Sequence, residues 1–166
     1  MQGSSEGKSS ISLATTVGRL KDGLGREVGV SDWFVLSQGH IDSFAEVTGD
    51  RQWIHVSPQR AERESPYGGT VAHGFLTLAL LSRFLAEVVQ VDGLAVNYGL
   101  NRVRFPAPVR AGAKIRAHFT LASLKDVPGG VEVLYSVAVE MQNADKPACV
   151  AEWLVRYYGS QAGLKC

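Results

Sequence analysis

The segment 74–90 constrains the fold most strongly, because apolar residues cover nearly the whole circumference of the helix it would form. A helix that is apolar on almost every side belongs inside a protein rather than on its surface. The positions concerned are Phe75, Leu76, Leu78, Leu80, Leu81, Phe84, Leu85, Val88 and Val89. The rest of the chain must therefore supply a layer that encloses this helix.

The sequence after residue 112 alternates between apolar and polar residues, which is the pattern of strands with one buried face. Turns that contain proline and glycine separate the alternating runs, as in an antiparallel meander. We expect strands at residues 27–35, 94–105, 114–121, 131–141 and 148–158. The prediction is an α+β hot-dog fold, in which an antiparallel sheet wraps around one long central helix.

Between the first expected strand and the apolar helix, the chain carries the signals of two shorter helices. Ser37 is suited to cap the first of them, and Gly49 stands where a glycine would end it. Ser57, which is followed by a proline, is suited to open the second. Asp50 is thereby placed just past a helix end, and His55 on the connection between the two helices.

The length of 166 residues and the hydrophobic content of 45% are sufficient for one domain with a substantial core. We expect a disordered tail at residues 1–13 and a single domain at residues 14–160. The 17 Lys and Arg residues against 16 Asp and Glu are scattered and give a net charge of +1, so nucleic acid is not an expected partner. No apolar run approaches the roughly 20 residues that span a bilayer, so we expect no membrane association.

The two cysteines, Cys149 and Cys166, form neither a disulfide framework nor a zinc-binding spacing, which favours a cytoplasmic protein. The histidines do not follow a His-x-x-x-His pattern, and the sequence contains no phosphate-binding or dinucleotide-binding loop. We therefore expect neither a metal nor a cofactor.

The stretch 48–55 brings a carboxylate and an imidazole, Asp50 and His55, five residues apart on a loop. Such a pair suits proton transfer in both directions, because one group can take a proton while the other delivers one. The spacing alone also fits a structural interpretation, in which Asp50 caps the next helical turn and His55 is a hydrogen-bonded loop residue.

The glycine-rich stretch 67–74 opens the apolar helix, where backbone N–H groups have no partner within the helix. Such groups can stabilise an oxyanion, and Gly74 N–H is the donor that we expect to do so. Alternatively, the glycines only fit the turn and allow close packing of the helix start. His73 is better suited to a structural, capping role than to catalysis.

Two motifs in a fixed order resemble those of the MaoC-like dehydratases, the family of the (R)-specific enoyl-CoA hydratases. The first motif runs from Phe-Ala-Glu-Val-Thr-Gly-Asp to Ile-His-Val, and the second reads Ala-His-Gly-Phe-Leu-Thr-Leu-Ala-Leu-Leu. Gln52 and Trp53, together with the stretch 97–109, look most like the NodN-like bacterial branch of that family. The resemblance extends over residues 25–158.

The resemblance implies a hot-dog homodimer in which Asp50 and His55 are the catalytic residues and the amide of Gly74 holds the thioester oxygen. Better-known members have Asn-Pro within the catalytic motif, where this chain has Gln52 and Trp53. We expect Gln52 to take over the hydrogen bonds of that asparagine. Side chains expected to shape the site are Gln52, Trp53, Tyr67, His73, Ser82 and Tyr98, with Phe75 as a further pocket residue.

Ser82 matches a serine that lies near the site in some members, although a helix hydroxyl is more often bonded to its own backbone. Cations are needed for the phosphates of CoA, and Arg51, Arg102 and Arg104 are the candidates. The acyl-chain length and the physiological direction of the reaction are not encoded in any motif of the sequence.

The expected activity is that of a lyase of fatty acid metabolism, an (R)-specific enoyl-CoA hydratase that adds water to trans-2-enoyl-CoA and gives 3-hydroxyacyl-CoA. An acyl-CoA thioesterase of the same fold is one alternative. Such thioesterases generally place a carboxylate on the central helix, where this chain has only Glu87 near the far end. A non-catalytic acyl-CoA-binding protein is a second alternative, which the departure at Gln52 and Trp53 keeps open.

Overall fold

Six strands pair antiparallel in one sheet within the described part of the chain, for which a computed structural model places residues 18, 20, 22–91 and 93–159. The strands are β1 (Glu27–Val30), β2 (Phe34–Val35), β3 (Gly93–Arg104), β4 (Lys114–Val127), β5 (Gly130–Met141) and β6 (Cys149–Gly159). Their order across the sheet is β1-β4-β5-β6-β3, and β2 also pairs with β4. The tail predicted at residues 1–13 lies outside the described residues.

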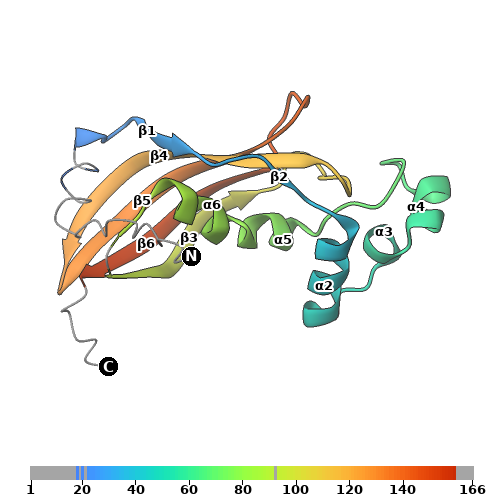
Figure 1. The fold of residues 1–166 in the computed structure, drawn as a ribbon, viewed down its shortest axis with the longest axis horizontal. Coiled ribbons are helices and arrows are strands. Elements are labelled where there is room, and N and C mark those ends of the chain that lie inside the picture. Colours follow the sequence, from blue (N-terminus) through green and yellow to red (C-terminus); the bar gives the residue numbers. More distant parts are fainter. Residues whose placement is uncertain (1–17, 19, 21, 92, 160–166) are drawn as a thin grey trace, which may run out of the picture.

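The helices in the described part are α2 (Gln38–Thr48), α3 (Trp53–Val56), α4 (Pro58–Glu64), α5 (Gly74–Ala79) and α6 (Leu81–Val88). The curved sheet extends over α5 and α6, while α2, α3 and α4 lie together beyond one end of it (Figure 1). This is the predicted hot-dog arrangement. Among the described residues, no helix is both long and apolar enough to cross a membrane.

The apolar segment 74–90 forms the central helix as predicted, but with an interruption at Leu80. Leu80 keeps right-handed helical angles (φ −65°, ψ −14°) between the end of α5 and the start of α6. Its amide donates to the carbonyl of Leu76 at 3.1 Å, and its carbonyl accepts from the amide of Phe84 at 3.0 Å. The chain therefore keeps its helical course through the interruption.

One side of the central helix packs against the sheet. Phe84 and Leu85 of α6 are buried in one cluster with the inward side chains Ile115 and Phe119 of β4. The other side is left uncovered by the described residues, and Phe75 is 71% exposed. The expectation of a helix buried on nearly every side is wrong for the single chain, because a sheet covers only one side of a helix.

The strand expected at residues 27–35 is split into β1 and β2. Between them, Ser31 Oγ accepts the N–H of Ala117 at 2.9 Å, so that a side chain replaces one bond of the ladder. The strand expected at residues 114–121 is longer than predicted, because β4 continues into a tight turn to β5. Gly129 supplies that turn with a positive φ of 76°.

Both ends of α2 agree with the prediction. Ser37 Oγ accepts the N–H of His40, whose Nδ1 accepts the N–H of Ser37, so the two residues form a capping box. Gly49 ends the helix with a φ of 75°, and its N–H donates to the carbonyl of Ala45. Ser57 precedes α4 as predicted, but its side chain makes no capping hydrogen bond. The loop after α2 therefore starts from a well-defined helix end.

A cluster of ionic side chains on the outer face of the sheet is centred on His118 of β4. Its Nδ1 and Nε2 each lie 2.8 Å from a carboxylate oxygen, of Glu27 and Glu140 respectively. Arg116 Nε donates to the Glu140 carboxylate at 2.6 Å. Burial alone lowers the pKa of His118, but the hydrogen bonds to Glu140 and Glu27 outweigh it and raise the pKa above its ordinary value. When it is protonated, His118 thus joins β1, β4 and β5 through ion pairs.

We expect His118→Gln to lower the free energy of unfolding more at about pH 6 than at about pH 8. Because the folded-state pKa is raised, the stabilisation is present below the unfolded-state pKa and is lost as the pH rises through the folded-state value. The cost at the lower pH should be about 0.5–1 kcal/mol, since the ion pairs are partly exposed. Urea unfolding at both pH values measures it.

Arg156→Gln is the matched control on the same face of the sheet. Arg156 Nε donates to the Glu132 carboxylate at 2.8 Å, and an arginine–carboxylate pair does not titrate between about pH 6 and about pH 8. The cost of this change should be the same at both pH values. If the cost of His118→Gln in free energy of unfolding is also the same at both pH values, the role given to the protonated imidazole is wrong.

Candidate active site

Asp50, His55 and His73 come together at the end of α2. A carboxylate oxygen of Asp50 and one ring nitrogen of each histidine lie within 4.8 Å of one another. Asp50 follows the left-handed Gly49, His55 belongs to the short helix α3, and His73 directly precedes α5. Three segments that are separate in the sequence thus bring a carboxylate and two imidazoles to one place.

A hydrogen bond to the backbone determines the tautomer of His55. The imidazole is buried, and its Nδ1 lies 2.6 Å from the carbonyl oxygen of Val71. Since a carbonyl can only accept, Nδ1 carries a proton, and Nε2 of the neutral ring keeps a free lone pair. This is the tautomer that a histidine needs in order to act as a general base through Nε2.

Asp50 presents an accessible carboxylate, since its side chain is 58% exposed. Among the described residues its Oδ1 accepts only a long hydrogen bond of 3.5 Å, from the amide of Gln52, and its own amide is 3.4 Å from Thr48 Oγ1. The shortest contact of the residue is made by its main-chain carbonyl, which accepts from His73 Nε2 at 2.9 Å. The carboxylate therefore remains available to a ligand or to water.

A cavity of about 510 Å³ opens beside these groups, between α2, the central helix and the strands β3 and β6. Asp50 and His73 line it, whereas His55 is not among the lining residues and stacks on His73 with ring centroids 3.8 Å apart. The walls are mainly apolar, as suits an acyl chain next to a small polar centre. The lining residues are Phe44, Thr48, Asp50, His73, Phe75, Leu78, Ala79, Leu81, Ser82, Asn97, Leu100 and Trp153.

Ser82 and Phe75, two of the residues singled out in the sequence, line this cavity. The hydroxyls of Ser43 and Thr48 donate to the carbonyls four residues earlier in α2. Ser82 makes no such bond in the described part of the chain. The hydrogen bond from its hydroxyl to the backbone of its own helix, which the sequence also allowed, is therefore not formed. Its hydroxyl is free to meet a polar group of a ligand.

Gly74 begins α5, and its N–H has no hydrogen-bond partner among the described residues. A Cβ at this position would lie 2.9 Å from Cδ2 of Phe105, closer than side chains normally approach. Only glycine therefore fits here without movement of that ring. An unpaired amide next to the cavity-lining residues His73 and Phe75 is a suitable donor to a developing oxyanion.

Gln38, rather than Gln52, ties the segment from α2 to α3 to the rest of the protein. Gln38 Nε2 donates to the carbonyl of His55 at 2.7 Å, and its Oε1 accepts the hydroxyl of Thr70 at 2.5 Å. The side chain of Gln52, which was expected to hold the loop, makes no hydrogen bond within the described residues. Gln52 precedes α3, and its side chain is exposed to solvent there.

Three other candidates do not line this cavity. Trp53 lies under the guanidinium of Arg60, which is 4.4 Å from the ring centroid. Tyr67 is exposed in the turn after α4. Tyr98 contacts the guanidinium of Arg156 at 3.3 Å from the ring centroid and is 53% exposed. Trp53 and Tyr98 thus each contact an arginine, and neither is a cavity-lining residue.

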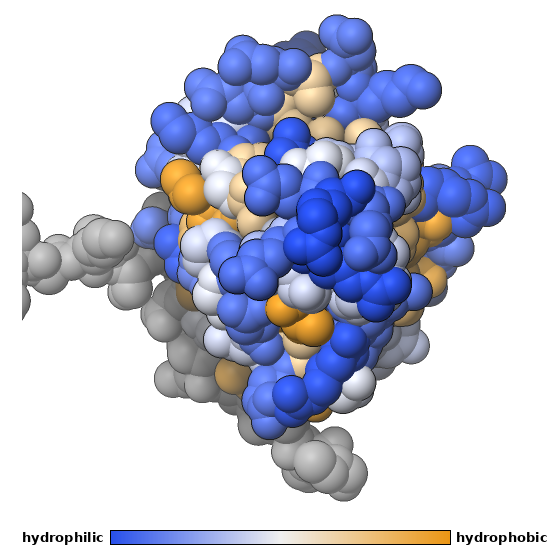
Figure 2. Space-filling model, turned by 90° about the vertical axis from the view of Figure 1, so that its right-hand side faces the viewer, coloured by the Kyte–Doolittle hydropathy of each residue, from blue (hydrophilic) through white to orange (hydrophobic). Residues whose placement is uncertain are grey.

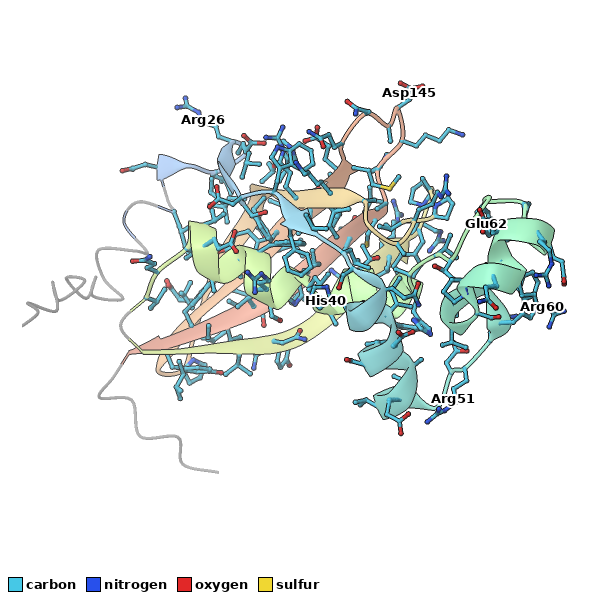
Figure 3. All side chains as sticks on the ribbon, turned by 45° about the vertical axis from the view of Figure 1, so that its right-hand side comes forward. Arg26, His40, Arg51, Arg60, Glu62 and Asp145 are labelled. Carbon is cyan, nitrogen blue, oxygen red and sulfur yellow. The ribbon has the colours of Figure 1, made fainter. Side chains whose placement is uncertain are left out.

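The arginines considered for CoA phosphates also lie away from the cavity. Arg51 pairs with Glu46 and projects from the helical end of the molecule (Figure 3). Arg102 is in register with Glu152 of β6, and Arg104 donates to a neighbouring backbone carbonyl. The helical end is mostly hydrophilic with small apolar patches (Figure 2). None of the three arginines is among the residues that line the cavity.

Asp50, His55 and His73 could be considered as ligands of a metal, because their donor atoms are close together. A zinc ion must lie in the plane of each imidazole, about 2.0–2.1 Å from its nitrogen. The two rings are stacked, with an angle of 27° between their planes, so their in-plane lone pairs point side by side rather than at a common point. The arrangement therefore fits proton transfer better than metal binding.

Comparison with known proteins places these motifs in a family. The MaoC like domain matches residues 20–143. The chain belongs to the MaoC-like dehydratase family.

Two curated relatives of this MaoC-like chain cover most of its length. It is 49% identical over 145 residues to 3-hydroxyacyl-thioester dehydratase Z of Mycobacterium tuberculosis, which covers 86% of this chain and 95% of the relative. It is 43% identical over 148 residues to Nodulation protein N of Rhizobium leguminosarum, which covers 87% of this chain and 89% of the relative. The likeness to the NodN-like branch is thus confirmed.

A solved structure of similar fold is the unliganded (R)-hydratase of Pseudomonas aeruginosa. It superposes on this MaoC-like chain with a TM-score of 0.65 at 23% sequence identity and covers 82% of each chain. At that identity the likeness concerns the fold alone, and it confirms the hot-dog architecture.

Several site residues of this MaoC-like chain were not found from the sequence. Phe44 and Thr48 belong to the first motif, but no role at the site was expected for them, and Gln38 belongs to no motif. Trp153 follows the inward alternation of β6, which predicts burial but not a cavity wall. Asn97 accepts a hydrogen bond from Trp153 Nε1 at 2.8 Å, a contact between strands that no local pattern reveals.

Gln38→Leu should lower the free energy of unfolding by about 1–3 kcal/mol, because the change leaves the Thr70 hydroxyl and the His55 carbonyl without partners. Thr70→Val removes one bond of the same pair and should cost less, since the bond from Gln38 to His55 remains. Urea unfolding measures both. Equal stability of Gln38→Leu and the wild type contradicts the role assigned to Gln38.

Proposed function

We propose that the chain is a 3-hydroxyacyl-thioester dehydratase, a hydro-lyase that interconverts (R)-3-hydroxyacyl and trans-2-enoyl thioesters by removing or adding water. Membership of the MaoC-like dehydratases supports the reaction class. The observation that carries the proposal is the bond from His55 Nδ1 to Val71, because it leaves the other ring nitrogen basic within the cluster that contains Asp50. We propose CoA as the carrier of the acyl group, and hydration of enoyl-CoA as one direction of the reaction.

In the proposed hydration, the thioester oxygen accepts a hydrogen bond from the Gly74 amide, and the acyl chain enters the apolar cavity. Water attacks C3, and His55 Nε2 takes one of its protons. The negative charge that develops on the thioester oxygen is stabilised by the amide, and the loss of one such donor costs about 3 kcal/mol in other enzymes. The unpaired state of the Gly74 N–H supports this role.

The second proton transfer in the proposal belongs to Asp50, whose carboxyl group protonates C2. The hydroxyl group of water is then on C3 and one proton is on C2, and transfer of the remaining proton from His55 to Asp50 restores both groups. Their proximity within 4.8 Å supports a direct or water-mediated return of that proton. The same groups catalyse dehydration in reverse order.

His73 is a weaker choice for the base, although it lines the cavity. Its Nε2 is engaged by the carbonyl of Asp50, and its Nδ1 is buried without access to solvent. Neither nitrogen therefore offers an accessible lone pair. The thioesterase alternative also lacks support, because Glu87 binds the amide of Asp32 and lies outside the cavity.

Turnover of short trans-2-enoyl thioesters tests the function. Hydration removes the absorbance of the conjugated double bond without release of thiol, hydrolysis releases thiol, and a binding protein does neither. Comparison of CoA with acyl carrier protein thioesters tests the proposed carrier. An (S)-specific 3-hydroxyacyl-CoA dehydrogenase should leave the product unoxidised, and rapid oxidation would contradict the (R) configuration.

Asp50→Asn and His55→Gln should each lower kcat by about 10² to 10⁴, because each change removes one proton-transfer group. The double variant should be scarcely slower than either single variant, since the two residues act on one water addition as a unit. Both changes are nearly isosteric, and circular dichroism checks that the variants are folded. Full activity of either single variant removes that residue from the catalytic pair.

We further propose that the protein is a homodimer formed through β3. This strand lies at one edge of the sheet, and only its pairing with β6 is observed among the described residues. Unpaired strand edges and exposed apolar patches favour association, and a two-fold axis would join two such edges. The exposed apolar residues on or near this edge are Phe75, Leu94, Val96, Tyr98, Leu100 and Phe105.

The wild type should scatter light as a particle of twice 17.9 kDa at micromolar concentration. Val96→Lys, on β3, should shift it toward the monomer, because two lysines would meet at the paired edges. Val47→Lys on α2 is the matched control, since Val47 is already 86% exposed, and this variant should remain dimeric. A wild type of only 17.9 kDa rules out the dimer.

A further inference from the structure

Three of the four residues from Val71 to Gly74 contribute a group to the candidate site. The carbonyl of Val71 sets the tautomer of His55, and the amide of Gly74 is the unpaired donor. Between them lies His73, which contacts both Asp50 and His55. The resemblance to other dehydratases assigns a chemical role to the acid, the base and the amide, whereas His73 was expected only to cap the helix or to shape the site.

The His73 ring is held between other side chains. It is 4% exposed, lies 5.1 Å from the Phe44 ring, and stacks on His55 at a centroid distance of 3.8 Å with 27° between the planes. Close packing of this kind leaves a ring little freedom to rotate. The orientation of His73 therefore restrains the plane of the His55 ring, as the carbonyl of Val71 restrains its tautomer.

The protonation of His73 follows from its two nitrogens. Nε2 is 2.9 Å from the main-chain carbonyl of Asp50, which can only accept, so Nε2 carries a proton. Nδ1 is buried and has no hydrogen-bond partner in the part of the chain that the structure describes, so a second proton there would have no acceptor in that part. His73 is thus a neutral donor to the backbone of Asp50, and the carboxylate itself is 4.0 Å from Nε2.

We propose that His73 is a positioning residue that sets the distance between the acid Asp50 and the base His55, an inference that rests on the proposed function. The shortest hydrogen bond of Asp50 is the one that its main-chain carbonyl accepts from His73. The bond at its amide is 3.4 Å long, and the bond at its carboxylate is 3.5 Å long. One side chain therefore anchors the loop of the acid and packs against the ring of the base. Removal of this link lets the two groups move apart.

Two substitutions of His73 each remove one of its contacts, with the Asp50 carbonyl or with the His55 ring, and keep the other. His73→Phe keeps a flat ring for stacking on His55 but lacks the N–H that binds the Asp50 carbonyl. His73→Gln keeps an N–H donor but lacks the stacked ring. A displacement of about 1 Å at a catalytic group can cost 10²-fold in rate, so we expect each variant to lose about 10- to 100-fold in kcat with KM changed less than about 3-fold.

The effect of the same substitution in a variant that lacks the Asp50 carboxyl group distinguishes a positioning role of His73 from a merely structural role. In an Asp50→Asn background, His73→Phe should lower kcat less than about 3-fold further, because the group that it positions is already disabled. A structural defect would lower kcat by the same factor in both backgrounds. His118→Gln, a histidine change on the outer face of the sheet, is the control for mild destabilisation and should leave kcat unchanged.

Nitrogen NMR of the imidazoles gives a readout that does not need turnover, and His73 should appear as the neutral Nε2–H tautomer. A wild type that turns over no thioester overturns the proposed function and this inference together. If the wild type is active but folded His73→Phe has an unchanged kcat, the inference alone is overturned. The inference alone is also overturned if His73→Phe lowers kcat by the same factor in the wild type and in the Asp50→Asn background. If His73→Phe does not fold, His73→Gln in both backgrounds decides in the same way.

Discussion

The packing of one side of the central helix against the inner face of the sheet is the interaction on which the rest of the structure depends. Phe84 and Leu85 are buried there with Ile115 and Phe119, and burial of each such side chain stabilises the fold by about 1.5–3 kcal/mol. A sheet can cover only one side of the helix. The cavity lies between α2, the central helix and the strands β3 and β6, and exposed positions of the helix such as Phe75 and Ser82 line it, so the site uses the part of the helix that is covered incompletely.

Backbone hydrogen bonds hold the segment before the central helix in place at the candidate site. The amide of Val71 donates to the carbonyl of Ile54 at 3.0 Å, and the amide of Ala72 donates to that of Val109 at 2.7 Å. An isolated bridge joins Val71 to Arg110. The segment is thus fixed to α3 on one side and to the chain before β4 on the other. Main-chain groups at fixed positions are suited to orient catalytic side chains, because they need no reorganisation during the reaction.

The elements of the fold could be predicted from local patterns, whereas part of the site could not. Ser37 and Gly49 predict the ends of α2 because they are typical helix-capping residues. The alternation of apolar and polar residues predicts β5 and β6. Two irregularities of register in β3, between Asn97 and Gly99 and between Leu100 and Arg102, change which residues face inward. Simple alternation therefore does not tell which residues of this strand face the cavity, and the contact that holds Asn97 comes from another strand.

The contrast between an exposed acid and a buried base has a consequence for catalysis in the proposed function. The side chain of Asp50 is 58% exposed, whereas His55 is 8% exposed. A thioester that covers Asp50 replaces water at the carboxyl group, which strengthens the electrostatic interactions inside the site. Its acyl chain simultaneously covers the apolar walls near Phe75, which gives a favourable free energy of burial. In the proposed reaction, binding of the chain would thus offset the cost of desolvating the acid, and the proton transfers would take place in a site closed by the substrate itself.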